Sequence, residues 1–142
     1  MTQPLDDHLF RQLDMSFVPC EHGGEFAMRL PVGPHITNTR GGLQGGLIAT
    51  LADVVAGIAL HEHLPAGTGA ATSDLNIHFL SAVTVGPAHA EAWIRRRGKH
   101  TAVTQVEVYD AGREVLAAIC TLTFAVVQLR EGQYDPKGSR TA

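Results

Sequence analysis

The sequence predicts an α+β fold in which a curved antiparallel sheet of about five to six strands wraps around one long central helix. Three observations support this prediction. A segment from about 45 to 63 is apolar on almost every side of a helix, so other elements must cover it nearly all round. The segments that follow alternate apolar and polar residues with the period of a strand. Their connections are too short for parallel crossovers, which requires antiparallel neighbours.

The elements before the central helix are short. Residues 5–14 have apolar residues at helical spacing and acidic residues in the first turn, which predicts a short helix. Residues 17–32 are typical of two strands joined by a turn at 21–24. The central helix follows over about 45–63, and Pro65 and Gly67 end it.

The segments after the helix predict the rest of the sheet. In the first of them, one face should present Ala71, Ser73, Leu75, Ile77 and Phe79, and the other Thr72, Asp74, Asn76 and His78. In the second, Ala90, Ala92 and Ile94 alternate with His89, Glu91, Trp93 and Arg95. Two more strands follow, joined by a tight turn at 110–112. A single domain is therefore expected over residues 1–128, with a mobile tail at 129–142.

Composition excludes several classes of protein. The chain of 142 residues is 44% hydrophobic and 18% charged, which is typical of a folded domain. A net charge of −3 predicts no binding to nucleic acid and no membrane association. The N-terminus does not resemble a signal peptide, so a cytoplasmic location is expected. Cys20 and Cys120 stand alone, without the spacing of a zinc site, and no metal site is predicted.

The segment NTRGGLQGGLIATLAD, residues 38–53, is the most unusual part of the sequence. It has four glycines within six positions and then becomes an apolar helix that contains one carboxylate, Asp53. A carboxylate in so apolar a segment is costly unless it has a partner or a function. Gly45 and Gly46 begin the helix, where backbone N–H groups lack intrahelical partners and the helix dipole is positive.

The pattern N-x-x-G-x-x-[H/Q]-G-G-x-x-x-x-L-x-D, which covers residues 38–53, resembles the phenylacetate-pathway (PaaI-like) acyl-CoA thioesterases of the hotdog superfamily. The later DLNIHFL, the RRRGK segment and the closing TFAVV are similar to that family in the same order, so the resemblance extends over about residues 24–127. It implies a hotdog fold and hydrolysis of an acyl-CoA thioester in a homodimer or homotetramer. It also implies that neither a metal nor an organic cofactor is needed.

The helix start can serve this chemistry. Glycine allows a substrate carbonyl to approach the backbone, so Gly45 and Gly46 would form an oxyanion hole. Asp53 would activate water as a base or attack the thioester carbon as a nucleophile. Eight residues of helix separate Gly45 from Asp53 by about 12 Å, too far for both to act on one carbonyl. The site would therefore lie between antiparallel helices of two subunits, and the small residues of the stripe Gly46, Thr50, Asp53 and Gly57 would permit their close approach.

The resemblance also implies roles for other residues. Asn38 would position the thioester or the water, Gln44 would flank the oxyanion hole, and Thr72 would hydrogen bond the attacking water. A shift of one residue in the strand would present Ser73 in place of Thr72. Most members of the family have histidine at the position of Gln44, and glutamine cannot transfer a proton near neutral pH.

The basic segment at 95–99 has two interpretations. It is either a solvated turn or a site for the CoA phosphates, formed by Arg95, Arg96, Arg97 and Lys99. The histidines at 61 and 63 are interpreted as a helix terminus, and His78 as a surface or interface residue. Two other functions stay open: an acyl-CoA-binding module without turnover, favoured by Gln44, and a hydratase or dehydratase that would use His35. The sequence leaves the acyl group open.

Overall fold

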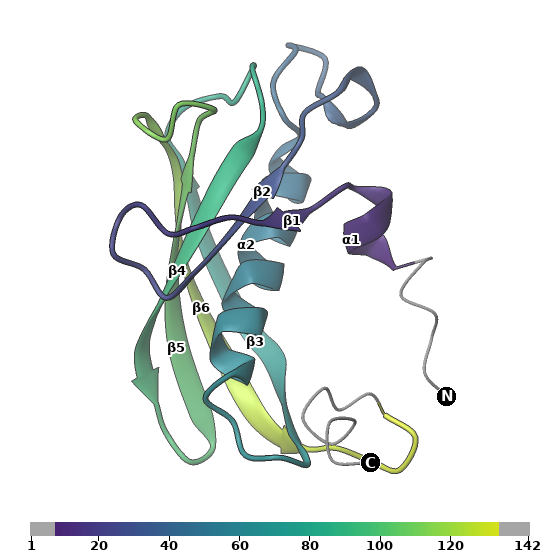
Figure 1. Ribbon diagram of the computed structural model, residues 1–142, viewed down its shortest axis with the longest axis vertical. Helices are drawn as coiled ribbons and strands as arrows, with labels where there is room; N and C mark the ends of the chain where they lie inside the picture. The colour runs from purple at the N-terminus through teal and green to yellow at the C-terminus, as the bar shows by residue number, and fades with distance from the viewer. Residues whose placement is uncertain (1–7, 134–142) are drawn as a thin grey trace.

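The computed structural model describes residues 8–133, and it has one long helix packed against a single sheet (Figure 1). The helical elements are α1 (Leu9–Gln12), the 3-10 helix η2 (Pro34–Ile36) and α2 (Gly45–His61). The strands are β1 (Ser16–Phe17), β2 (Phe26–Leu30), β3 (Thr68–Phe79), β4 (Ala88–Arg97), β5 (Thr101–Tyr109) and β6 (Leu116–Gln128). Within the described residues, no helix is both long enough and apolar enough to cross a membrane.

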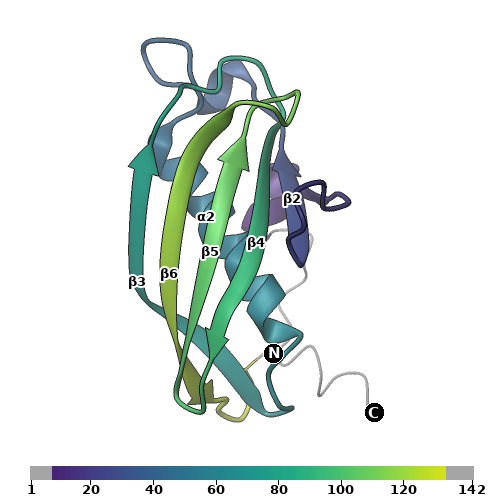
Figure 2. The same ribbon diagram turned by 90° about the vertical axis from the view of Figure 1, so that its left-hand side faces the viewer.

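The six strands form one antiparallel sheet in the order β1-β2-β4-β5-β6-β3. Figure 2 shows this sheet from the side opposite α2, which lies behind it. The predicted architecture, a curved antiparallel sheet around one central helix, is therefore confirmed. The longest strands, β3 and β6, are paired along almost their whole length, and β3 forms one edge of the sheet.

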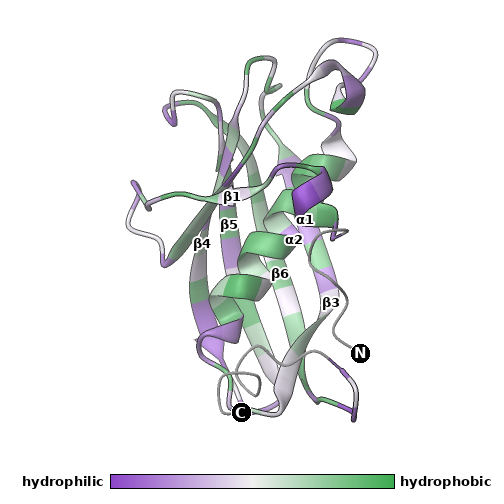
Figure 3. Ribbon diagram, turned by 45° about the vertical axis from the view of Figure 1, so that its right-hand side comes forward, coloured by the Kyte–Doolittle hydropathy of each residue, from purple (hydrophilic) through white to green (hydrophobic). Residues whose placement is uncertain are grey.

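The packing of α2 explains why the helix is so apolar. Figure 3 shows apolar residues along most of its length. One side packs onto the sheet and is buried; its residues are Ile48, Leu51, Ala52, Val55, Ala56, Ala59 and Leu60. The strands supply the other half of this core, with Met28, Leu30, Val106, Val108, Leu122 and Phe124 among its fully or almost fully buried side chains.

The ends of the elements differ slightly from the predicted limits. The helix α2 ends at His61, two residues before the predicted end, because the chain turns there to bury Leu64. The first helix is shorter than predicted: within the described residues it covers only Leu9–Gln12, and it ends before Asp14, whose φ is +58°. The predicted start at residues 5–7 and most of the predicted tail lie outside the described residues, and Leu129 donates its N–H to the carbonyl of Gly67.

The loop between β1 and β2 is anchored on the outer face of the sheet by one carboxylate. Glu91 lies on the predicted polar face of β4, yet it is only 3% exposed because residues 18–25 fold over it. Its oxygens accept the backbone N–H groups of Glu21 at 2.7 Å, His22 at 2.9 Å and Gly24 at 3.1 Å. A Cβ at Gly24 would lie 2.5 Å from Cγ of Glu91, so this close approach requires glycine.

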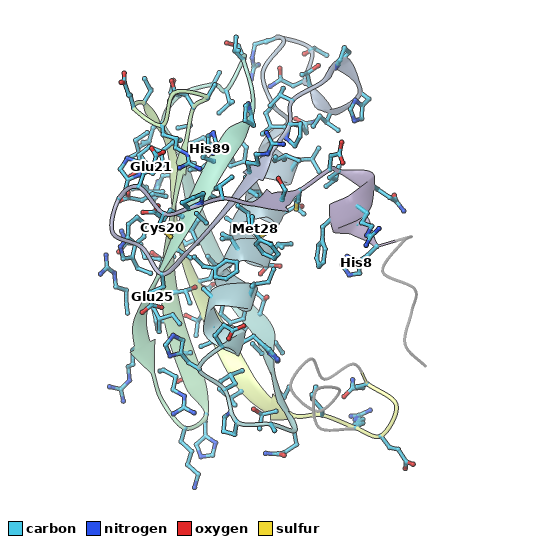
Figure 4. The ribbon with its side chains drawn as sticks, in the orientation of Figure 1. His8, Cys20, Glu21, Glu25, Met28 and His89 are labelled. Atoms are coloured by element: carbon cyan, nitrogen blue, oxygen red, sulfur yellow. The ribbon has the colours of Figure 1, made fainter. Side chains whose placement is uncertain are left out.

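Arg113 makes a second set of contacts to the same loop. Its Nε donates to Nδ1 of His89 at 2.9 Å, and its Nη1 donates to the carbonyl of Pro19 and pairs with the carboxylate of Glu21. His89 must therefore be neutral at Nδ1 for this contact to form. Figure 4 shows Cys20, Glu21 and His89 together on the side of β4 away from α2.

We expect part of the pH dependence of unfolding to come from His89. Burial, followed by the charge of Arg113, lowers the pKa of His89 below its usual value. The unfolded chain therefore binds a proton at higher pH than the folded protein, and stability is lost as the pH falls below the ordinary histidine pKa. Between about pH 7.5 and about pH 5, the Tm should fall more steeply in the wild type than in His89→Gln, which keeps an acceptor for Arg113. Equal slopes would contradict this prediction.

Candidate active site

The turn before α2 is built by Asn38 and two glycines. The side-chain oxygen of Asn38 accepts the N–H groups of Arg40 at 2.9 Å and of Gly42 at 3.2 Å. Gly41 has a φ of +82°, which favours glycine, and a Cβ on Gly42 would be 3.4 Å from Cβ of Ala82. The amide oxygen of Asn38 is thus used to shape the turn, and its NH₂ group is the part left for a ligand.

The two glycines that begin α2 have different surroundings. A Cβ on Gly45 would lie 3.3 Å from the ring of Phe79, whereas a Cβ on Gly46 would meet no atom of the described residues within 4 Å, apart from its chain neighbours and the backbone of its own helix. Gly46 is exposed. Packing inside the subunit therefore explains the glycine at 45 but not the one at 46, although glycine in a helix is less favourable than alanine by up to about 1 kcal/mol. The open space beside Gly46 is available to a ligand or to another subunit.

The first turn of α2 presents backbone donors to this space. Gln44 is the N-cap, its side chain makes no capping hydrogen bond, and its carbonyl accepts from Leu47 and Ile48. In residues 8–133 no acceptor is found for the N–H groups of Gly45 and Gly46. Unpaired N–H groups at the positive end of a helix dipole stabilise an oxyanion.

Asp53 lies two turns further along α2, on a side that the sheet reaches only with its edge strand β3. It is half-buried, and the hydroxyl of Thr72 on β3 donates to its Oδ1 at 2.7 Å. This bond fixes the orientation of the carboxylate and leaves Oδ2 for another donor. The predicted stripe of α2, Gly46, Thr50, Asp53 and Gly57, is the exposed or half-buried side of the helix, with Leu47, Val54 and Ile58 beside it.

A β-bulge at Ser73 makes the contact between Thr72 and Asp53 possible. Thr72 is opposite Phe124 and Asp74 is opposite Thr123, so Ser73 is the extra residue. Thr72 therefore faces α2, and so do Leu75, Ile77 and Phe79 beyond the bulge. The prediction that Ala71 and Ser73 share a face with these three residues is wrong, because regular alternation does not continue through a bulge.

The basic residues lie at the other end of the molecule from the start of α2 (Figures 1 and 2). Arg95, Arg96 and Arg97 belong to the last part of β4 rather than to a turn, and Lys99 follows in the hairpin; all four are exposed. Arg95 donates to the side-chain oxygen of Gln105 at 3.0 Å, and its guanidinium lies 5.7 Å from the ring centre of Trp93. Within one subunit, this basic segment is near the C-terminal end of α2.

Other candidate groups are not arranged for catalysis. Burial raises the pKa of the Cys120 thiol to about 12, and burial together with Glu91 raises that of Cys20, so neither is a ready thiolate. His35 is exposed and its ring packs against Gly33. His63 pairs with Glu25 at 3.4 Å. In the part of the chain that the structure describes, no group of three or more metal-binding side chains occurs.

Comparison with known proteins identifies the family. Residues 41–117 match the model of the thioesterase superfamily. A predicted esterase of Saccharolobus solfataricus is 30% identical over 105 residues, which are 74% of each chain. This chain therefore belongs to the thioesterase superfamily, and thioester hydrolysis is the general activity that this membership supports.

Solved structures agree with the fold. A thioesterase of Haemophilus influenzae superposes with a TM-score of 0.81, covering 92% of this chain and 90% of its own, at 22% identity. A Bacillus halodurans protein solved with CoA has a TM-score of 0.76 and is 32% identical, covering 86% of this chain and 80% of its own. The hotdog fold expected from the helix motif is thus confirmed.

Sequence reasoning did not find two features of this site. The bulge at Ser73 has no signal in the alternating pattern of its strand. The alternating pattern gives Phe79 no special role, yet its side chain is 54% exposed and its ring lies against Gly45. Gly45 is the sequence signal that could have indicated this contact, because a glycine at the start of a helix leaves room for a neighbouring side chain to pack against the backbone.

Two threonine-to-valine substitutions should show how much a hydroxyl at the candidate site and a hydroxyl in the core each contribute to the free energy of unfolding. Thr72→Val removes one partly solvated hydrogen bond, so the free energy of unfolding should fall by no more than about 1.5 kcal/mol. Thr104 is fully buried, and its hydroxyl has no hydrogen-bond partner within the described residues. Thr104→Val should therefore be neutral or raise the free energy of unfolding by about 1 kcal/mol. Urea titrations measure both; a larger loss in Thr72→Val would make that bond a structural requirement.

Proposed function

We propose that this protein is an acyl-CoA thioesterase that releases the free acid and CoA. The observation that supports this most directly is the 2.7 Å hydrogen bond from Thr72 to Asp53, which is half-buried on the partly exposed stripe of α2. It holds a carboxylate where a ligand can reach it, on the same helix whose open N-terminus can stabilise an oxyanion. The relative solved with CoA supports CoA as the carrier of the acyl group.

In the proposed reaction, the free oxygen of Asp53 takes a proton from water. The resulting hydroxide attacks the thioester carbon, and the N–H groups of Gly45 and Gly46 stabilise the negative charge on the carbonyl oxygen. The C–S bond then breaks, and the CoA thiolate takes the proton from Asp53. In a direct attack, the carboxylate bonds to the thioester carbon, the C–S bond breaks and the CoA thiolate leaves, and water then opens the resulting anhydride; this route needs the same residues. Thr72 keeps the carboxylate oriented in both cases.

The site needs two subunits, because about 12 Å of helix separates Gly45 from Asp53. Two copies of α2 in antiparallel orientation place the donors of one beside the carboxylate of the other. The exposed edge strand β3, with hydrogen-bonding groups unpaired along one side, is available to the same partner. A homodimer, or a homotetramer made of two such dimers, is therefore part of the proposed function.

The same arrangement gives the basic segment a role. Arg95, Arg96, Arg97 and Lys99 lie near the end of α2, and in an antiparallel pair this end is beside the partner's helix start. The basic side chains of one subunit would then bind the CoA phosphates while the acyl group enters the site. Arg96, Arg97 and Lys99 are the better candidates, since Arg95 already pairs with Gln105.

Gln44 favours a second function, binding of acyl-CoA without hydrolysis. At the helix start, a glutamine can orient a carbonyl or a water but cannot transfer a proton. If the reaction needs a proton donor at this position, the protein would bind acyl-CoA without hydrolysing it. In the proposed mechanism Asp53 performs all proton transfer, and an orienting group at position 44 is sufficient.

Substitution of the carboxylate tests the mechanism. Asp53→Asn should lower kcat by about 10³-fold or more with little change in stability, because the amide cannot take a proton. Thr72→Val should lower kcat by about 10-fold, since the carboxylate of Asp53 remains but is less well oriented. Release of free thiol from a panel of acyl-CoAs measures both. Wild-type rates in Asp53→Asn would refute the mechanism, and thermal stabilisation by acyl-CoAs without any thiol release would support the binding module.

Mixing two inactive variants tests the shared site. Asp53→Asn lacks the carboxylate, and Gly46→Val fills the space beside the donors. A mixed dimer would contain one intact site, formed by Gly46 of one subunit and Asp53 of the other. Unfolding and refolding an equal mixture should restore about a quarter of the wild-type activity by random pairing. Light scattering should give two or four times 15.2 kDa. A monomeric mass, or no recovery of activity, would refute a site between subunits.

A further inference from the structure

The ring of Phe79 lies against the backbone at the start of α2. Its Cζ and Cε1 atoms are 3.3 Å and 3.4 Å from the place where a Cβ on Gly45 would be. Phe79 is the last residue of β3, opposite Ala118, and the bulge at Ser73 turns it toward the helix. The glycine at 45 is thus matched to this aromatic ring.

The same ring is not covered by the rest of the described chain. Phe79 is 54% exposed, whereas most large apolar side chains on the inner face of the sheet are buried or half-buried. One side of the ring is fixed on Gly45 and the remainder is open beside the unpaired N–H groups. An exposed aromatic ring in contact with a helix start is available for apolar contact with a ligand held there.

A single strand contacts both of the groups that one subunit would contribute to the two shared sites. Thr72, near the beginning of β3, binds Asp53, and Phe79, at its end, touches Gly45. The inward-facing residues between them, Leu75 and Ile77, are apolar and half-buried. An acyl group whose carbonyl oxygen is held by the donors of α2 must place its first carbon atoms beside the Phe79 ring. The residues of β3 that face α2 between Thr72 and Phe79 offer these carbons no polar partner.

We propose that Phe79 determines which acyl groups are accepted, by packing its ring against the carbons next to the thioester. This inference rests on the proposed function. A flat ring held on the backbone favours acyl groups that are flat or unbranched at these carbons, such as straight-chain and aryl groups. It excludes groups that branch next to the carbonyl, because the ring cannot move toward Gly45.

The test compares butyryl-CoA with isobutyryl-CoA, which differ only in branching beside the carbonyl. The wild type should prefer the straight chain, and Phe79→Ala should reduce the ratio of the two kcat/KM values by about 10-fold or more, as one methyl group in a packed site does. Phe79→Leu should give an intermediate ratio. Phe17→Ala is the matched control, since Phe17 is 64% exposed on β1, at the opposite edge of the sheet. Circular dichroism should show that all variants are folded.

Binding of the corresponding non-hydrolysable thioethers separates this inference from the proposed function. If the wild type hydrolyses acyl-CoAs but Phe79→Ala keeps the wild-type ratio, the inference is overturned and the proposed function stands. If no acyl-CoA is hydrolysed and no thioether binds, the proposed function fails and the inference fails with it. If thioethers bind without hydrolysis of their thioester counterparts, a changed order of affinity in Phe79→Ala supports the inference, and an unchanged order overturns it.

Discussion

The burial of α2 is the constraint on which the rest of this structure depends. A helix that is apolar on almost every side cannot be stable in water, and one flat sheet could cover only one side of it. The sheet therefore curves around the helix, and five of its six strands share in the covering. What remains is one stripe of exposed or half-buried residues, and Asp53 lies on it. The curvature of the sheet and the position of the carboxylate thus both follow from the need to bury α2.

The bulge at Ser73 changes which residues of the edge strand β3 face α2. With strict alternation in β3, a strand that buries Leu75 and Ile77 would turn Thr72 away from the helix. One extra residue allows the strand to present a hydroxyl to Asp53 and still present apolar residues further along. The hydroxyl of Ser73 itself donates to the carbonyl of Thr123 at 3.1 Å, so the bulge is held within the sheet.

The sequence was sufficient for the features that have a local signal. The period of 3.6 and the change to a period of 2 predicted α2 and the antiparallel strands. The site at Gly45, Gly46 and Asp53 stays a prediction. Features that depend on distant segments could not be predicted. Glu91 has the pattern of a surface residue, and only the loop at 18–25 buries it. The resemblance implies that Thr72 hydrogen bonds the attacking water, whereas in the structure its hydroxyl donates to Asp53, and the bulge that allows this contact depends on pairing with β6.

The carboxylate of Glu91 also has a consequence for the order in which the chain folds. Its three backbone partners are 67 to 70 residues earlier in the sequence. During synthesis, the loop at 18–25 therefore has no acceptor for these N–H groups until β4 has left the ribosome and joined the sheet. Contacts of such long sequence separation form late, because closing the intervening chain costs entropy. The hairpin of β1 and β2 is therefore completed only after residue 91 has been made, although all of its residues precede β4 in the sequence.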